Sequence, residues 1–246
     1  NKNIPKGIIK MEFFMKQNVV FLTKLRYDRG ISEPSRNSWE YWCNKNNHKL
    51  FIHEGENPWS NFSNVFNILE ENNIEYNKIF LVNGSSIVKW DCPNIFNLTD
   101  DRLGAWREMG NLGAIYKSIQ SSNLDVDIFK YVNYGSFIIN KNHKEFFEIA
   151  SKTTHRNITE TSFQTSVNSL LQSNSIEINM DISREYNLNH MMPYDWYSHN
   201  WQDGKDKTNF FIKYSYLWRF DDLDNNKYDD ISSQIWNSIK NKYTSI

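Results

Sequence analysis

The chain has few cysteines and almost no net charge. Its two cysteines in 246 residues, Cys43 and Cys92, do not lie in the Cys-x-x-Cys or Cys/His spacing of a zinc site, so we expect two reduced thiols. The formal net charge of −1 argues against broad electrostatic attraction to polyanions, which makes nucleic acid a disfavoured partner.

Long apolar runs, repeats and linkers are also missing. No run approaches the roughly 18 apolar residues of a membrane span, and no signal-peptide-like segment is present, so we expect a soluble, cytoplasmic chain without a membrane partner. With 39% hydrophobic residues and no linker, residues 1–246 are expected to form a single α/β domain. The chain begins at Asn1 rather than at methionine, which leaves open a larger parent protein.

Three short apolar runs in the first third of the chain have the composition of buried strands: residues 19–22, 50–52 and 79–82. Predicted helices separate them, so the order is βαβαβ. This order predicts a parallel sheet with right-handed crossovers, in which ligands bind at the carboxyl ends of the strands. The first strand leads into Thr23 and Lys24, and we expect these two residues at a ligand-binding edge.

The first of these helices is predicted over residues 38–46, with Ser35 or Asn37 as its N-cap. The second is predicted over residues 60–73, with Ser60 as its N-cap. In both segments, aromatic and aliphatic residues recur at the i, i+3, i+4 spacing of an apolar helix face.

The rest of the chain alternates between extended and helical patterns. A strand pair bent at Tyr134-Gly135 is predicted over residues 127–140, and an extended segment over residues 214–220. Helices are predicted near residues 114–119, 141–150, 159–171 and 229–243. The aromatic-rich residues 186–201 are typical of a segment that wraps a surface or lines a pocket.

The most informative stretch is residues 79–96, which read IFLVNGSSIVKWDCPNIF. A strand leads into the polar turn Asn83-Gly84-Ser85, followed by a short apolar pair and a Pro-Asn-aromatic segment. Together with the block YVNYGSFIINK at residues 131–141 and with Gln164-Thr165, this layout resembles the small GT-A fold glycosyltransferases of phages and bacteria, which use nucleotide-sugar donors. The resemblance extends over about residues 19–220 and implies a Rossmann-like, mostly parallel sheet flanked by helices.

Compared with that family, the acidic residues are replaced. The turn Asn83-Gly84-Ser85 stands where the family has an Asp-x-Asp triplet that holds a divalent cation against the donor's diphosphate. Phe163 stands where an aspartate precedes the glutamine, and Arg219 stands where a histidine completes the metal ligands. The Asn-x-Gly turn at Asn133 and Gly135 matches the family.

A donor site without a metal follows from these replacements. Hard cations prefer carboxylate ligands, and neither Asn83 nor Ser85 is charged, so we expect no divalent metal and no other cofactor. Arg219, or Lys213 on the same segment, is expected to replace the cation, because a guanidinium pairs with phosphate oxygens through parallel hydrogen bonds. The alternative for Arg219 is a packing or surface role. The residues predicted to bind the donor are Thr23, Lys24, Asn83, Ser85, Asn133, Gly135, Gln164, Lys213 and Arg219.

The catalytic residue stays open, because Phe163 cannot act as a base. Glu108, Glu160 and Asp195 are the candidates, and each has the alternative of a solvated charge. Two hypotheses of function follow. The first is a metal-independent glycosyltransferase that moves a sugar from a nucleotide donor, bound by about residues 18–100, to an unidentified hydroxyl acceptor on the side of about residues 101–246. The second is a catalytically inactive glycosyltransferase-like domain that serves as a structural or partner-binding module.

Overall fold

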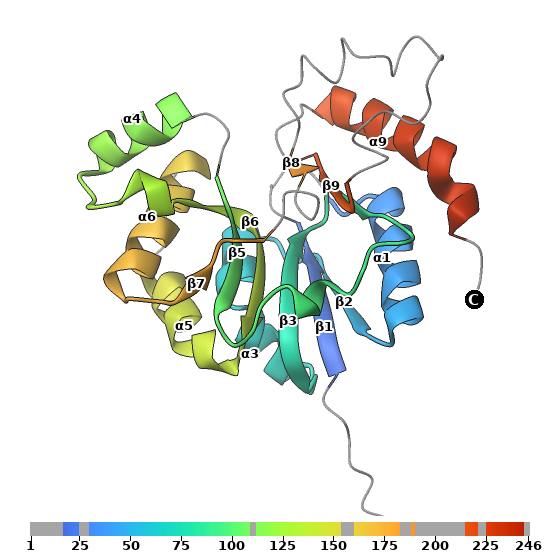
Figure 1. The fold of residues 1–246 in the computed structure, drawn as a ribbon, viewed down its shortest axis with the longest axis horizontal. Coiled ribbons are helices and arrows are strands. Elements are labelled where there is room, and N and C mark those ends of the chain that lie inside the picture. Colours follow the sequence, from blue (N-terminus) through green and yellow to red (C-terminus); the bar gives the residue numbers. More distant parts are fainter. Residues whose placement is uncertain are drawn as a thin grey trace, which may run out of the picture.

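The computed structural model describes residues 17–24, 30–108, 112–153, 160–182, 188–189, 215–220 and 225–243. A six-stranded sheet lies at the centre of this part of the chain, with helices against both of its faces (Figure 1). None of the described helices is long and apolar enough to span a membrane.

The central sheet has the strand order β2-β1-β3-β6-β5-β7. Its strands are β1 (Gln17–Thr23), β2 (Lys49–His53), β3 (Tyr76–Asn83), β5 (Leu103–Arg107), β6 (Val132–Asn140) and β7 (Ile178–Asn179). All of them run in one direction except β6, which pairs antiparallel with β3 and β5. The prediction of a mostly parallel sheet is confirmed. The carboxyl ends of β1, β2, β3 and β5 therefore meet at one edge, together with the amino end of β6.

At this edge, β6 departs from regular pairing. Ala105 of β5 pairs with Phe137, while the next residue, Trp106, pairs with Asn133, so residues 134–136 form a bulge. The predicted strand pair over residues 127–140 is wrong, because the chain before β6 forms a 3-10 turn, η2 (Ile128–Lys130), capped by the Asp127 side chain. The predicted bend coincides with the bulge of a single strand.

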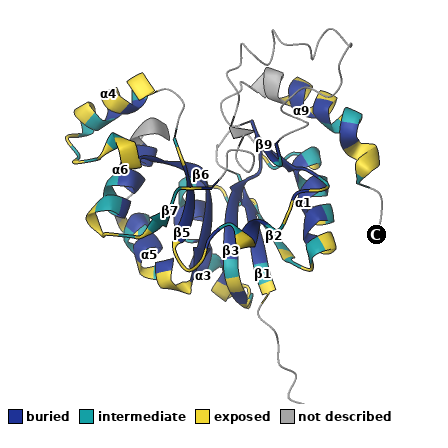
Figure 2. Cartoon of the chain, in the orientation of Figure 1, coloured by how far each residue is buried: buried dark blue, intermediate teal, exposed yellow. Residues whose placement is uncertain are grey.

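Both faces of the sheet are buried (Figure 2). Successive residues of β1 alternate between two hydrophobic clusters, with Phe21 in the first and Leu22 in the second. The first cluster is completed by α2 (Pro58–Ser63), α3 (Val65–Glu71), α5 (Lys144–Thr153) and α6 (Glu160–Ser173). The second is completed by Trp39 and Trp42 of α1 (Glu33–Asn46). The helix α4 (Leu112–Ser122) packs against α6.

A second, three-stranded sheet brings the C-terminal part of the chain to the same edge. It consists of β4 (Ser86–Val88), β9 (Leu217–Arg219) and β8 (Leu188–Asn189), in that order. β9 runs antiparallel to β4, with Arg219 opposite Ser86. The helix α9 (Asn225–Ile239) packs on this sheet, with Ile235 buried in one hydrophobic cluster with Ile87 and Trp218. Since β4 follows β3 after a tight turn, β9 lies next to the end of β3.

Two helix starts differ from the prediction. α1 begins at Glu33 and is capped by Ser32, whose Oγ accepts a hydrogen bond of 3.2 Å from the backbone N–H of Ser35. Ser35 and Asn37 therefore lie inside the helix rather than at its cap. Pro34 is tolerated because the first turn of a helix has no intrahelical use for its N–H group.

The helix predicted over residues 60–73 is two helices, α2 and α3, separated at Asn64. Ser60 is not the N-cap. Asn57 takes that role, because its Oδ1 accepts the backbone N–H groups of Trp59 and Ser60 at 3.1 and 3.2 Å. The four later helices predicted from the sequence are present as α4, α5, α6 and α9, with ends that differ from the prediction by up to four residues. Most of residues 186–201 lie outside the described residues.

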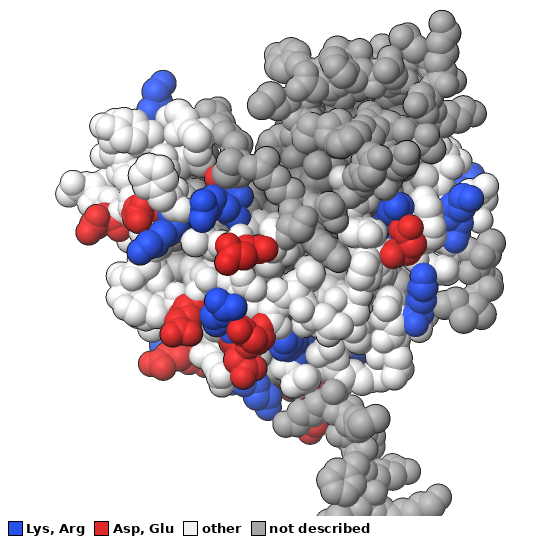
Figure 3. Space-filling view, in the orientation of Figure 1, with Lys and Arg blue, Asp and Glu red and all other residues white. Residues whose placement is uncertain are grey.

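The charged side chains show no basic face in the view of Figure 3. Lysine and arginine side chains are interspersed there with aspartate and glutamate side chains. Among the described residues, ion pairs join Arg36 to Glu54, Arg102 to Asp100 and Lys144 to Glu70. The described residues visible on this face therefore form no continuous basic surface of the kind that attracts nucleic acid.

Candidate functional site

The turn between β3 and β4 lies at the carboxyl edge of the sheet. Asn83, the last residue of β3, pairs with Thr23, the last residue of β1. The Oδ1 atom of Asn83 accepts hydrogen bonds from the backbone N–H of Ser85 at 2.9 Å and from its hydroxyl at 3.0 Å. The N–H of Gly84 donates to the carbonyl of Thr23 at 2.7 Å. The turn is therefore an Asx-turn locked onto the end of β1.

This turn does not fit a divalent cation. Hard cations are held by several oxygen ligands that include carboxylates, whereas the amide oxygen of Asn83 already accepts two hydrogen bonds from Ser85. Across the part of the chain that the structure describes, no three His, Cys, Asp or Glu side chains are grouped so that they could hold a metal ion.

Arg219 reaches the turn from the far end of the sequence. It lies opposite Ser86 in the small sheet, and the next residue, Phe220, donates its N–H to the carbonyl of Ser85 at 3.0 Å. The Arg219 side chain is only 2% exposed. Its guanidinium lies directly against Gly135, where a Cβ atom would overlap Nη2. Glycine at position 135 is thus what leaves room for the arginine.

Asn133 connects this guanidinium to a carboxylate. Its Oδ1 accepts hydrogen bonds from Nη1 of Arg219 at 2.6 Å and from the N–H of Gly135 at 2.9 Å. Its Nδ2 donates to Oε2 of Glu108 at 2.6 Å, and Nε2 of Gln164 donates to the same oxygen at 3.3 Å. We call these four side chains, Arg219, Asn133, Glu108 and Gln164, the edge network.

The buried side of α6 fixes Gln164. Asn168, one turn later and fully buried, accepts the backbone N–H of Val132 at 2.7 Å and donates to its carbonyl at 2.9 Å, so that α6 is attached to β6 as a neighbouring strand would be. The hydroxyl of Tyr131 lies 2.9 Å from that of Thr165. Burial raises the pKa of Tyr131, although its hydrogen bonds to Thr165 and Gln164 oppose this, and the phenol stays protonated at neutral pH.

Phe163 points away from the edge network into the core. Its ring centroid lies 4.4 Å from that of Trp59 and 5.4 Å from that of Tyr134. It belongs to the first hydrophobic cluster and is 4% exposed. The helix α6 therefore directs Gln164 to the carboxylate and Phe163 to the apolar interior.

Most of the predicted site residues lie at the carboxyl edge of the sheet, and the others lie outside the described residues. Asn83, Ser85, Asn133, Gly135, Gln164 and Arg219 are brought together at this edge, either in the turn or in the edge network and its contacts. Thr23 lies at the same edge and donates its hydroxyl to the carbonyl of His53 at 2.9 Å, and Lys24 follows it, partly exposed. Lys213 and Asp195 lie outside the described residues, as does the side chain of Glu160.

Two residues matter more in the structure than the sequence alone indicates. The sequence does not distinguish Glu108 from Glu160 and Asp195, but Glu108 lies in the edge network directly after β5. Asn168 joins α6 to β6. Its spacing of i+4 from Gln164 on a predicted helix is the signal that places both residues on one face.

No protein-family model matches the chain, and no curated protein matches it. Solved structures do match. A glycosyltransferase involved in the glycosylation of the major capsid of PBCV-1 aligns with a TM-score of 0.56 at 9% identity, over 88% of this chain and 98% of that chain. The WbbM bifunctional glycosyltransferase aligns with a TM-score of 0.56 at 16% identity, over 95% of this chain and 52% of that chain. This chain has a GT-A glycosyltransferase fold.

The GT-A fold extends over most of the chain, because the two alignments cover 88% and 95% of it. The fold implied by the resemblance of residues 79–96 is therefore confirmed. In this GT-A fold the edge network joins three strands and a helix that are distant in sequence, namely β5, β6, β9 and α6.

Proposed function

We propose that the chain recognises a nucleotide-sugar donor at the carboxyl edge of its central sheet, without a metal ion, and transfers the sugar to a hydroxyl acceptor. The observation that carries this proposal is the place of Arg219. Arg219 is buried and pairs with Ser86, directly after the β3–β4 turn where the resemblance implies a cation, and its guanidinium is hydrogen-bonded to Asn133.

The chemistry of donor cleavage requires such a charge. When the sugar leaves a nucleoside diphosphate, negative charge develops on the phosphate oxygens and must be stabilised. A guanidinium is permanently charged and offers parallel N–H donors to phosphate. Its field is also stronger in a buried setting than in water. Arg219 therefore supplies the positive charge that Asn83 and Ser85 cannot hold as a metal site.

The topology assigns donor binding and acceptor binding to different parts of the chain in this proposal. We assign nucleotide binding to about residues 18–100, with Thr23 and Lys24 at the end of β1 and the turn at Asn83 nearest the phosphates. The acceptor side is assigned to about residues 101–246, from which Glu108 and Gln164 reach the same edge.

A second candidate function is that of an inactive domain that binds a partner. Two observations favour it. Asn83 and Ser85 hydrogen-bond to each other, and Phe163, in the position of a family aspartate, lies in the apolar core. Such a domain would retain the GT-A fold and have no transferase activity.

A donor-release assay distinguishes the two functions. The protein is incubated in excess EDTA with UDP-glucose, UDP-galactose, UDP-N-acetylglucosamine and GDP-mannose, and free nucleoside diphosphate is measured. Release from at least one donor that EDTA does not reduce supports the transferase. No release from any donor, with no binding of UDP or GDP by calorimetry, supports the inactive module.

A further inference from the structure

Glu108 occupies a constrained position in the edge network. It directly follows β5 and is half-buried. Two amide groups converge on a single oxygen, Oε2, with Asn133 at 2.6 Å and Gln164 at 3.3 Å. Two amide donors on one oxygen fix the plane of the carboxyl group that accepts from them. Glu108 is therefore held as an oriented carboxylate.

Asn133 also fixes the distance between this carboxylate and the guanidinium. Its Oδ1 accepts from Arg219 and its Nδ2 donates to Glu108, so one amide group separates the two opposite charges. In a nucleotide sugar, the anomeric carbon is bonded to an oxygen of the distal phosphate. A phosphate bound at Arg219 therefore places the sugar bonded to it within a short distance of Glu108.

We propose that Glu108 is the catalytic carboxylate of the transfer and faces the anomeric carbon, with Asn133 and Gln164 as its positioning residues. This inference rests on the donor-binding function proposed above. It also accounts for Phe163, since a carboxylate at the end of β5 takes the place of one on α6.

The step balances without a metal or a further reactant. The bond between the anomeric carbon and the phosphate oxygen breaks, and its electron pair leaves with the nucleoside diphosphate beside Arg219. Positive charge develops on the sugar ring, and ionised Glu108 stabilises it. The acceptor oxygen forms the new bond to the anomeric carbon, and its proton passes to the departing diphosphate. Glu108 neither gains nor loses a proton in this step.

The test compares Glu108→Gln, Glu108→Ala and a control, Glu70→Gln. Glu70 is a half-exposed carboxylate that pairs with Lys144 and lies at the end of α3, outside the edge network. Turnover is measured in EDTA with UDP-glucose, UDP-galactose, UDP-N-acetylglucosamine and GDP-mannose, and binding with UDP and GDP. We expect Glu108→Gln to lower kcat by about 100-fold or more, because it keeps the shape and removes the charge. Binding of UDP and GDP should change by less than about threefold.

Sodium formate provides a readout that a structural role would not move. A small carboxylate can enter the space left in Glu108→Ala, so formate should raise the kcat of that variant and leave those of the wild type and Glu70→Gln unchanged. The proposal is overturned if Glu108→Gln keeps the wild-type kcat. It is also overturned if Glu108→Gln loses kcat and the binding of UDP and GDP together. A wild type that binds UDP or GDP but releases neither from any donor overturns it and leaves donor binding standing. A wild type that binds no nucleotide overturns both.

Discussion

Arg219 and Asn133 are 86 positions apart in the sequence and are joined by a hydrogen bond of 2.6 Å from Nη1 to Oδ1. The contact depends on two structural features, the pairing of β9 with β4 and the bulge of β6 at residues 134–136. It attaches the C-terminal segment to the middle of the central sheet at the edge where ligands bind in such folds.

The close approach of Arg219 to Gly135 predicts the effect of a single methyl group. In Gly135→Ala the new Cβ overlaps the guanidinium, so the arginine must move or the strands must part. Such overpacking costs about 1–3 kcal/mol, and we expect this loss in urea denaturation. Gly30→Ala is the matched control, because nothing lies within 4 Å of a Cβ at Gly30. Equal stability of the two variants would contradict the described contact.

Asn168 is predicted to contribute more to the free energy of unfolding than Asn174, an exposed asparagine directly after the same helix. Asn168→Ala leaves the N–H and carbonyl of Val132 without their partner in the interior, at a cost of about 1–3 kcal/mol for each buried group. Asn174→Ala, directly after α6, removes an exposed hydrogen bond of 2.8 Å to the carbonyl of Leu170 and should cost far less. Guanidinium denaturation of both variants measures the difference, and a similar loss in both would refute this role for Asn168.

Divalent metals are predicted to leave the protein unchanged. Because Asn83 and Ser85 bond to each other, we expect manganese and magnesium at millimolar concentration to shift the melting temperature no more than potassium chloride of equal ionic strength. Melting curves with and without UDP measure this. A saturable shift with manganese that is absent in Asn83→Ala would show that the turn binds a cation.

Stability should fall in mild acid through His143. Its Nδ1 accepts the backbone N–H of Asn140 at 3.0 Å, and burial lowers its pKa below the ordinary value of 6.5. Below that pH the unfolded chain binds a proton that the folded chain does not, so the free energy of unfolding decreases as pH falls. His143→Gln keeps an acceptor that does not titrate. Its free energy of unfolding should therefore fall less between pH 7.5 and 5.5 than that of the wild type, and an equal fall would exclude His143 as the cause.

Burial also lowers the pKa of His48, whose Nε2 lies 3.2 Å from Oδ1 of Asn94. The remaining pH dependence of the His143→Gln variant should therefore be reduced again when His48 is replaced by glutamine. If replacing His48 leaves this pH dependence unchanged, groups other than His48 are its cause.

The sequence predicted β1, β2 and β3 because these buried parallel strands are short apolar runs, whereas no strand was predicted at β5 (Leu103–Arg107). Helix starts were less predictable, since Asn57 and Ser60 are both good caps and the choice depends on the first turn that Pro58 favours. The strand pair over residues 127–140 failed for a related reason. A bulge and a strand end have the same local sequence signal at Tyr134-Gly135, and the pairing with β5 decides between them.

Site residues next to a strand end could be predicted from the sequence. Contacts that depend on the register between two paired strands could not. Asn83 and Asn133 could be placed because each belongs to a recognisable turn. The contact between Asn133 and Glu108 follows from the pairing of β5 with β6 across the bulge, which no local pattern encodes. The proposal of Glu108 therefore depends on the structure, whereas Asp195 and the side chain of Glu160 lie outside the described residues.

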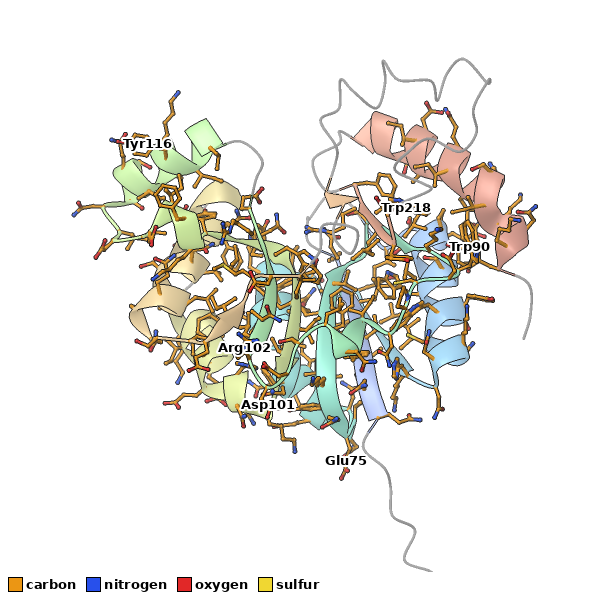
Figure 4. The ribbon with its side chains drawn as sticks, in the orientation of Figure 1. Glu75, Trp90, Asp101, Arg102, Tyr116 and Trp218 are labelled. Carbon is orange, nitrogen blue, oxygen red and sulfur yellow. The ribbon has the colours of Figure 1, made fainter. Side chains whose placement is uncertain are left out.

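The most direct test of the account is the difference in binding free energy between a nucleoside diphosphate and its nucleoside, measured by calorimetry in EDTA. UDP is compared with uridine, and GDP with guanosine, for the wild type, Arg219→Ala and Arg219→Lys. Arg102→Lys is the control, because Arg102 directly precedes β5 (Figure 4) whereas Glu108 of the edge network directly follows it. Melting curves confirm that each variant is folded.

If Arg219 binds the diphosphate, the preference for diphosphate over nucleoside falls by about 1.5–3 kcal/mol in Arg219→Ala, because hydrogen bonds to charged groups are lost. It falls by less in Arg219→Lys, which keeps the charge and loses the parallel N–H donors, and it is unchanged in Arg102→Lys. A folded Arg219→Ala protein that keeps the wild-type preference would contradict the account.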